Sequence, residues 1–209
     1  MENTNKMITT LTAYNEFIRP YHDAIHLVQI KLEALNTDYG YRYRHNPIHQ
    51  ITQRVKSLES IFNKLSKKNY DVTLENAKEY LTDIAGVRVI TYYQQDVYEL
   101  VRALRECFDV VEERDYIKNP KPSGYRSYHM IAIIPIHYLQ GVEYYPVEIQ
   151  IRTLTMDCWA NIEHQLHYKT LQEDFSGNIS QQFQQYAEEL NELSLKMEAI
   201  YSVQNKNTA

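Results

Sequence analysis

One short segment limits the fold of this chain more than any other, because it alternates apolar and polar residues without a break. From Val147 to Arg152 the sequence reads VEIQIR, so the three apolar residues share one parity while Glu148, Gln150 and Arg152 share the other. Side chains alternate between the two faces of a β-strand, and this pattern therefore predicts a strand with one apolar face. That face must be covered, which requires a sheet packed on a core.

The polar face of this strand fits two interpretations. One is the solvent-exposed face of a mixed sheet, which is common. The other is the floor of a cleft, where Glu148 offers a carboxylate, Gln150 an amide and Arg152 a guanidinium to a polar ligand. The strand alone does not decide between them.

The remaining segments predict helices and strands in an interspersed order. Apolar residues at helical spacing predict helices at about 11–35 (one kinked helix or two short ones, with the interruption near Pro20), 48–67, 73–81, 95–108, 156–168 and 181–201. Strands are expected at about 86–93, 110–117, 128–138 and 142–151. This order predicts an α+β fold, a mixed β-sheet of about five strands flanked by helices.

Length and composition predict one domain over residues 1–209. A chain of 209 residues with 44% hydrophobic residues can bury one substantial core. N-terminal helices at about 11–68 and a C-terminal helix at about 178–203 would pack on that core or mediate oligomerisation. No run of eighteen apolar residues and no secretory signal is present, so we expect a cytoplasmic protein without a membrane span.

The charge is unevenly distributed. The net charge is −5, yet seven lysines and arginines between residues 42 and 68 stand against Glu59 alone. A basic island in an acidic protein fits a compact polyanion such as a nucleoside triphosphate better than a long nucleic acid, which requires an extended basic stripe.

Two further segments carry candidate chemistry. Asp83 precedes the expected strand 86–93, and Arg88 lies within it. A carboxylate suits Mg²⁺ and an arginine suits phosphate, although an aspartate that caps a turn and pairs with the arginine is the other interpretation. The loop 118–126, KNPKPSGYR, is excluded from regular structure by two prolines and a glycine. It suits a phosphate cradle with a stacking tyrosine, or an ordinary surface turn.

Six motifs in this order resemble the synthetase domain of the RelA/SpoT superfamily. They are RVKS (54–57), DIAGVR (83–88), RDYI (114–117), PKPSGYRSYH (120–129), EIQIRT (148–153) and WANIEH (159–164). The length and flanking helices are similar to those of the stand-alone small alarmone synthetases of Gram-positive bacteria. The resemblance implies a nucleotidyltransferase-like fold and Mg²⁺-dependent transfer of the pyrophosphoryl group of ATP to the 3′-hydroxyl of GTP or GDP, in stringent-response signalling.

The resemblance also implies residue roles. Asp83 and Glu148 would be catalytic and bind the Mg²⁺ cofactor, with Glu148 deprotonating or orienting the 3′-hydroxyl. The ATP-binding residues would be Arg54 and Arg88 beside adenine, with Lys56, Ser60, Lys64 and Lys67 at the phosphates. The GTP- or GDP-binding residues would be Tyr125, stacked on guanine, with Arg114, Lys121, His129, Gln150, Arg152 and Glu163 near the phosphates or sugar. In a regular helix Arg54 and Lys56 would face opposite sides. Either they contact different sides of ATP, or the helix begins later.

Several further expectations follow from the resemblance. Family members are similar in forming homotetramers, and RNA or an alarmone could act as a regulator. His22-Asp23 stands without further metal ligands, so no alarmone hydrolysis is expected. Two alternatives remain: a catalytically silent nucleotide- or RNA-binding regulatory module, and a polymerase-β-like nucleotidyltransferase. The second needs two closely spaced carboxylates beside a Gly-Ser turn, a pair that the sequence lacks.

Overall fold

The computed structural model describes residues 2–169 and 177–206. Its elements follow the order α1 (Glu2–Tyr43), β1 (Ile48–Val55), α2 (Leu58–Lys67), α3 (Leu74–Tyr80), β2 (Ala85–Thr91), α4 (Gln94–Cys107), β3 (Asp109–Asp115), β4 (Tyr128–Tyr138), β5 (Gly141–Thr153), α5 (Leu154–Lys169) and α6 (Gly177–Lys206). The expected α+β fold with a mixed sheet of five strands is confirmed. None of the helices in the described ranges is long and apolar enough to cross a membrane.

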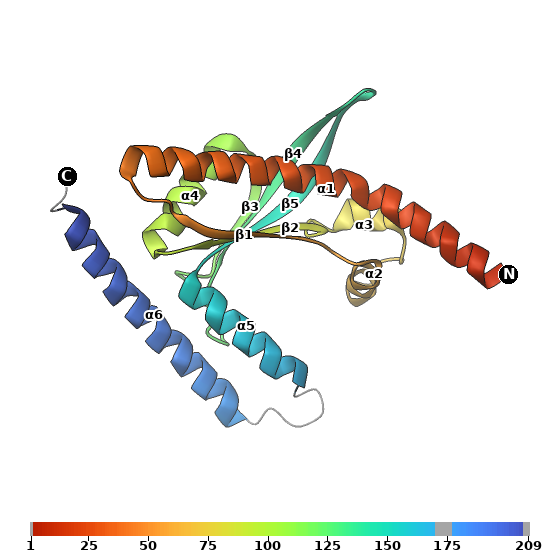
Figure 1. The fold of residues 1–209 in the computed structure, drawn as a ribbon. Coiled ribbons are helices and arrows are strands. Elements are labelled where there is room, and N and C mark those ends of the chain that lie inside the picture. The colour runs from red at the N-terminus through yellow and green to blue at the C-terminus, as the bar shows by residue number, and fades with distance from the viewer. Residues whose placement is uncertain (1, 170–176, 207–209) are drawn as a thin grey trace.

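The five strands form one sheet in the order β1-β2-β5-β4-β3. The central pair, β2 and β5, is parallel, and the other three pairs are antiparallel. Figure 1 shows α1 along one side of this sheet, with α5 and α6 on the other. The sheet therefore has one face under α1, and its opposite face is bordered by α5.

The apolar face of the sheet carries the core. Val87 of β2 lies opposite Ile149 of β5, and both are almost fully buried. They belong to one cluster with Tyr21, Ile25 and neighbouring residues of α1 and with the buried face of α4. Because neighbouring strands in register present side chains to the same face, the residues of opposite parity share the other face.

The helix expected over residues 48–67 is wrong in its first half. Ile48–Val55 is the edge strand β1, paired antiparallel with β2, and α2 begins only at Leu58. Ser57 has extended backbone angles and its side chain accepts from the Ser60 amide, which caps α2. β-Branched residues such as Ile51 favour the strand. Arg54 therefore lies on a strand and Lys56 in the turn after it, which removes the conflict of two helix faces.

The first helix is longer than expected and continuous. It runs from Glu2 to Tyr43 with Pro20 inside, rather than as two short helices. Proline removes one backbone hydrogen bond of the helix. Burial of Tyr21, Ala24, Ile25 and Val28 against the sheet directly after Pro20 offsets that loss.

Candidate active site

The polar face of the sheet lines a cleft. In the strand register Gly86 lies opposite both Arg54 and Glu148, and Arg88 lies opposite Gln150. The cleft has a volume of about 250 Å³, and its walls are Thr52, Gln53, Arg54, Asp83, Gly86, Val87, Arg88, Glu148 and Gln150. Gly86 leaves the floor without a side chain. The alternating segment of β5 is therefore a cleft floor rather than a plain solvent-exposed face.

Asp83 lies at the entrance of β2 and is held by two lysines. Its Oδ2 accepts from Lys56 Nζ at 3.1 Å and from Lys64 Nζ at 2.6 Å. The Lys56 amide also donates to the Ile84 carbonyl at 2.8 Å, which fixes the turn before α2 beside β2. Burial raises the pKa of Asp83, but the hydrogen bonds and charges of Lys64 and Lys56 outweigh it, so this pKa lies below its usual value.

The second oxygen of Asp83 fits a divalent cation. Asp83 Oδ1 is buried and has no hydrogen-bond partner. Glu148 is close enough for the charge of Asp83 to act on its pKa. In the described ranges no group of three or more His, Cys, Asp or Glu residues could hold a metal. Two carboxylates with water and phosphate oxygens form the donor set that Mg²⁺ prefers, so the residues fit this ion.

Glu148 and four other side chains close a ring of hydrogen bonds. His129 Nδ1 lies 3.2 Å from Glu148 Oε1, and His129 Nε2 lies 2.8 Å from Tyr125 Oη. Arg152 Nη2 donates to Tyr125 Oη at 2.5 Å and to Gln150 Oε1 at 3.0 Å. Gln150 Nε2 completes the ring by donating to Glu148 Oε2 at 2.9 Å. The ring fixes the orientation of the carboxylate without any ligand.

The ring also controls the ionisation of Glu148. Burial raises its pKa and the charge of Asp83 does so weakly, while hydrogen bonds from His129 and Gln150, with the charge of His129, lower it. The lowering outweighs the raising, so the pKa of Glu148 lies below its usual value. Glu148 is therefore ionised near neutral pH and can accept a hydrogen bond or a proton.

The loop between β3 and β4 brings cations to an aromatic ring. Lys121 Nζ lies 4.9 Å from the centre of the Tyr125 ring and 4.8 Å from that of Tyr116. The Arg152 guanidinium carbon lies 4.9 Å from the centre of the Tyr125 ring. Such contacts are cation–π interactions. An aromatic face between positive charges suits a nucleobase with phosphates attached.

Asp157 is a site residue that the sequence reasoning missed. It lies in the first turn of α5, and its Oδ1 accepts from Arg88 Nη1 at 3.4 Å and from Arg152 Nη1 at 3.3 Å. It thus links an arginine of β2 to one of β5. Burial and the charge of Arg152 lower the pKa of Arg88. The only local signal is an acid in the first turn of a helix, a position that the helix dipole also favours.

Four of the expected site residues lie away from this centre. Ser60 bonds to Ser57 at the start of α2. Lys67 is exposed in the last turn of α2. Arg114 lies opposite His129 in the register but pairs with Glu112. Glu163 lies on α5 outside the cleft lining. The structure brings the other expected residues to the cleft, its Asp83 end or the hydrogen-bond ring, except Lys121, which lies against the aromatic ring of Tyr125.

Comparison with known proteins identifies the family. The family described as a region found in RelA / SpoT proteins matches residues 53–173. The chain belongs to the RelA/SpoT family. The match spans all six motifs that carry the resemblance, so the resemblance is confirmed.

Similar members of the RelA/SpoT family match over most of their length. The GTP pyrophosphokinase YwaC of Bacillus subtilis is 38% identical over 194 residues, 92% of each chain. The GTP pyrophosphokinase YjbM of B. subtilis is 40% identical over 168 residues, 79% of this chain and 76% of the relative. The crystal structure of B. subtilis small alarmone synthetase 1 bound to its product pppGpp is 35% identical, with a TM-score of 0.81 and coverage of 91% of this chain and 97% of that one.

Proposed function

We propose that this chain is a GTP or GDP pyrophosphokinase that makes pppGpp or ppGpp. The observation that carries the proposal is the ionised Glu148, held by His129 and Gln150 of the ring, in one cleft with Asp83. Asp83 and the two lysines that hold it, Lys56 and Lys64, form the Asp83 cluster. Relatives with this fold over nearly the whole chain are GTP pyrophosphokinases and alarmone synthetases by name. Both lines of support favour an enzyme over a catalytically silent regulatory module.

The reaction joins an oxygen of the acceptor to the β-phosphorus of ATP. The 3′-oxygen of GTP or GDP attacks this phosphorus, the bond from the β-phosphorus to the oxygen bridging it to the α-phosphorus breaks, and AMP leaves with that oxygen. The proton of the 3′-hydroxyl goes to Glu148, whose carboxylate is the ionised acceptor in the cleft. No covalent intermediate is required, so positioning and neutralisation of charge carry the catalysis.

The donor side is built on the Asp83 cluster. Asp83 and Glu148 would hold Mg²⁺, which neutralises phosphate charge when bound. Lys56 and Lys64 would pair with ATP phosphates, since both ammonium groups already converge on one point at Asp83. Arg54 and Arg88 line the cleft and would contact adenine. Ser60 and Lys67, further along α2, would complete the phosphate contacts.

The acceptor side is built on the loop between β3 and β4. Tyr125 would stack on guanine, and Lys121 would pair with its phosphates. The ribose would lie beside Glu148, positioned by Gln150, Arg152 and His129, because the hydrogen-bond ring links these three residues to Glu148. Further contacts to the nucleotide would come from Arg114 and Glu163 at the edge of the site. The proposal includes no alarmone hydrolysis.

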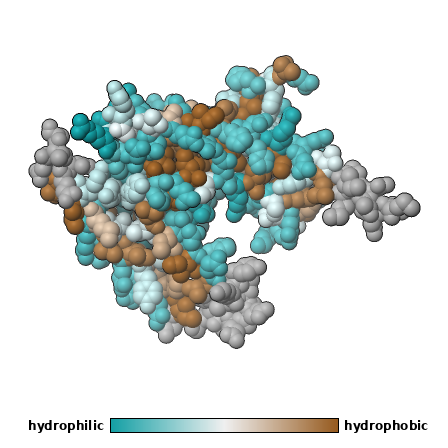
Figure 2. Space-filling view, in the orientation of Figure 1, coloured by the Kyte–Doolittle hydropathy of each residue, from teal (hydrophilic) through white to brown (hydrophobic). Residues whose placement is uncertain are grey.

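Assembly and location complete the proposal. We propose a cytoplasmic homotetramer in which one synthetase domain spans residues 1–209, with a regulatory alarmone or RNA bound outside the cleft. Figure 2 shows apolar surface along α6. Its exposed apolar residues include Leu193, Leu195, Met197, Ile200 and Val203. Burial of such a surface between copies would stabilise an oligomer, and the mass measured by light scattering tests its size.

Product analysis of wild type and Glu148→Gln tests the proposed reaction. Purified protein is incubated with ATP, Mg²⁺ and either GTP or GDP, and nucleotides are separated by ion exchange. The proposal expects pppGpp or ppGpp with an equal amount of AMP from wild type, and neither from the variant. Pyrophosphate in place of AMP would support the polymerase-β-like alternative. Guanosine nucleotide binding with no product from wild type would support the regulatory module.

A further inference from the structure

The loop between β3 and β4 (residues 116–127), which we call the acceptor loop, rests directly on α6. Gly124 of this loop has φ +94, and a Cβ there would lie 2.6 Å from Ala187 Cβ and 3.2 Å from Gln184 Cα. Only glycine allows both that backbone angle and that approach. The backbone beside Tyr125 therefore packs closely on α6, against the Ala187 methyl group and the Gln184 backbone.

A buried arginine ties the loop to the same helix. Arg126 is only 8% exposed. Its Nη1 donates to the Gly124 carbonyl at 3.3 Å, and its Nη2 donates to Glu188 Oε2 of α6 at 2.6 Å. A buried guanidinium requires a partner, and Glu188 is the one carboxylate described for it. The contact thus spans two segments that are far apart in the chain.

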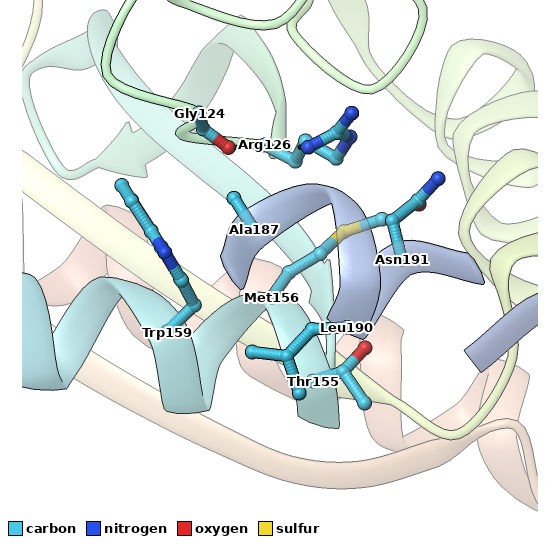
Figure 3. A pocket seen from close by; sticks show the side chains of 8 residues that line it. All are labelled: Gly124, Arg126, Thr155, Met156, Trp159, Ala187, Leu190 and Asn191. Atoms are coloured by element: carbon cyan, nitrogen blue, oxygen red, sulfur yellow. Dashed lines mark hydrogen bonds between the residues drawn. The ribbon is translucent and has the colours of Figure 1, made fainter. Parts of the chain in front are cut away.

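An apolar seam lies below this ion pair. Trp159 of α5 donates from Nε1 to the Phe183 carbonyl of α6 at 2.9 Å, and it forms a buried cluster with Ala160 and Ala187 against which Tyr125 packs. Figure 3 shows Trp159, Ala187 and Leu190 around the crevice below Gly124 and Arg126. That crevice measures about 10 Å³, too little for any ligand larger than one water. The seam is a packing contact rather than a binding pocket.

The loop contributes one member, Tyr125, to the hydrogen-bond ring. Tyr125 contacts both His129 and Arg152 through its hydroxyl, and its backbone follows Gly124 directly. On the donor side, Asp83 pairs with Lys56 of the turn before α2 and with Lys64 of α2. A change at α6 therefore reaches the acceptor side of the cleft directly through Tyr125, and it reaches the donor side only through the longer path of Arg152, Asp157 and Arg88.

We propose that α6 positions the acceptor loop through the Arg126–Glu188 pair, and that Glu188 is a positioning residue selective for the guanosine nucleotide. The inference rests on the proposed function, because it takes the loop as the acceptor site. The pair holds Tyr125 in place for stacking before the nucleotide arrives, so less ordering is needed on binding. Loss of the pair therefore weakens binding of the guanosine nucleotide and leaves binding of ATP unaffected.

The matched variants Glu188→Gln and Glu192→Gln test the proposal. Both remove one carboxylate from an exposed position of α6, but only Glu188 contacts the loop. Steady-state kinetics are measured with each substrate varied in turn. We expect Glu188→Gln to raise the KM for GTP about tenfold, because the buried arginine loses a charged partner, and to leave the KM for ATP unchanged. Glu192→Gln should match wild type. Equal changes in both KM values, or none, would overturn the proposal.

Two further measurements separate positioning from damage to the seam. Trp159 is the single tryptophan of the chain and is 4% exposed, so its emission reports the α5–α6 seam. We expect its emission maximum to be unchanged in Glu188→Gln. A second variant, Arg126→Lys, keeps the charge but cannot reach both Gly124 and Glu188, and should raise the KM for GTP selectively. If its KM for GTP equals that of wild type, the proposal is wrong even where Glu188→Gln has disturbed the seam.

Direct binding distinguishes failure of this inference from failure of the proposed function. Binding of a fluorescent GDP analogue without ATP requires no turnover. Weaker binding to Glu188→Gln than to wild type and Glu192→Gln supports the positioning role whether or not product forms. Equal binding by all three overturns it, while absence of pppGpp from wild type contradicts only the proposed reaction.

Discussion

Replacing Asp157 by asparagine should weaken both halves of the active site together. The carboxylate accepts from Arg88 of β2 and from Arg152 of β5 through the same oxygen. Asparagine has the same shape and can still accept from Asn161, which donates to the other oxygen. The variant therefore removes the charge between the two arginines without opening a cavity.

The size of the effect follows from the geometry. Hydrogen bonds to charged groups contribute about 1.5–3 kcal/mol. The two contacts are 3.4 and 3.3 Å long, at the weak end of the range, and Arg88 is 36% exposed while Arg152 is 5% exposed. We therefore expect a loss of about 1.4 kcal/mol, or tenfold, in kcat/KM for ATP and for GTP alike.

Steady-state kinetics with each nucleotide varied at saturating levels of the other measure this effect. Asp109→Asn, at the exposed first position of β3, is the matched control and should equal wild type. Thermal unfolding of both variants checks that the fold is retained. A loss confined to one nucleotide, with the other unchanged, would refute the idea that Asp157 links the two arginines.

Three further predictions concern the site residues. The lowered pKa of Glu148 keeps it ionised down to acid pH, so kcat/KM should fall only below the usual pKa of glutamate, about 4.3. His129→Gln removes a group that lowers this pKa and should move the acid limb of the pH profile to higher pH. An unmoved pH profile would contradict the role of the hydrogen-bond ring in setting the pKa of Glu148. Tyr125→Ala should weaken GTP binding about tenfold or more through lost stacking, with ATP binding unchanged in the same titration. Asp83→Asn leaves the 9% exposed Lys56 without its carboxylate and should lower the unfolding free energy by about 1–3 kcal/mol in urea denaturation; a variant as stable as wild type would show that the pair contributes nothing.

The strands and helices with strong local patterns were predictable from the sequence. The segment 147–152 alternates strictly, and it is the floor of the cleft because α1 covers its apolar face. Tyr128–Tyr138 begins and ends where the sequence predicted. The segment 48–55 was not predictable in this way, because Ile51 and Val55, four residues apart, suit a helix as well as a half-buried strand. Its pairing with β2 decides the structure, and that pairing is a tertiary contact.

The same limit applies to the site. Residues inside a local motif, such as Asp83, Glu148 and Tyr125, could be named from the sequence. Asp157 lies 69 residues from Arg88, and Glu188 lies 62 residues from Arg126. Neither pair leaves a local signal that would single it out, since an acid in a helix is most often a solvated residue. Their roles follow only from the fold that brings these segments together.

The position of the label after turnover tests the central claim most directly. ATP labelled at the α-phosphate and ATP labelled at the γ-phosphate are incubated in parallel with the protein, Mg²⁺ and unlabelled GTP, and the products are separated by chromatography. A pyrophosphoryl transfer predicts that the γ-label appears in a guanosine pentaphosphate and the α-label appears only in AMP. The α-label in the guanosine product, or the γ-label in free phosphate or pyrophosphate with no labelled guanosine nucleotide, would contradict the account.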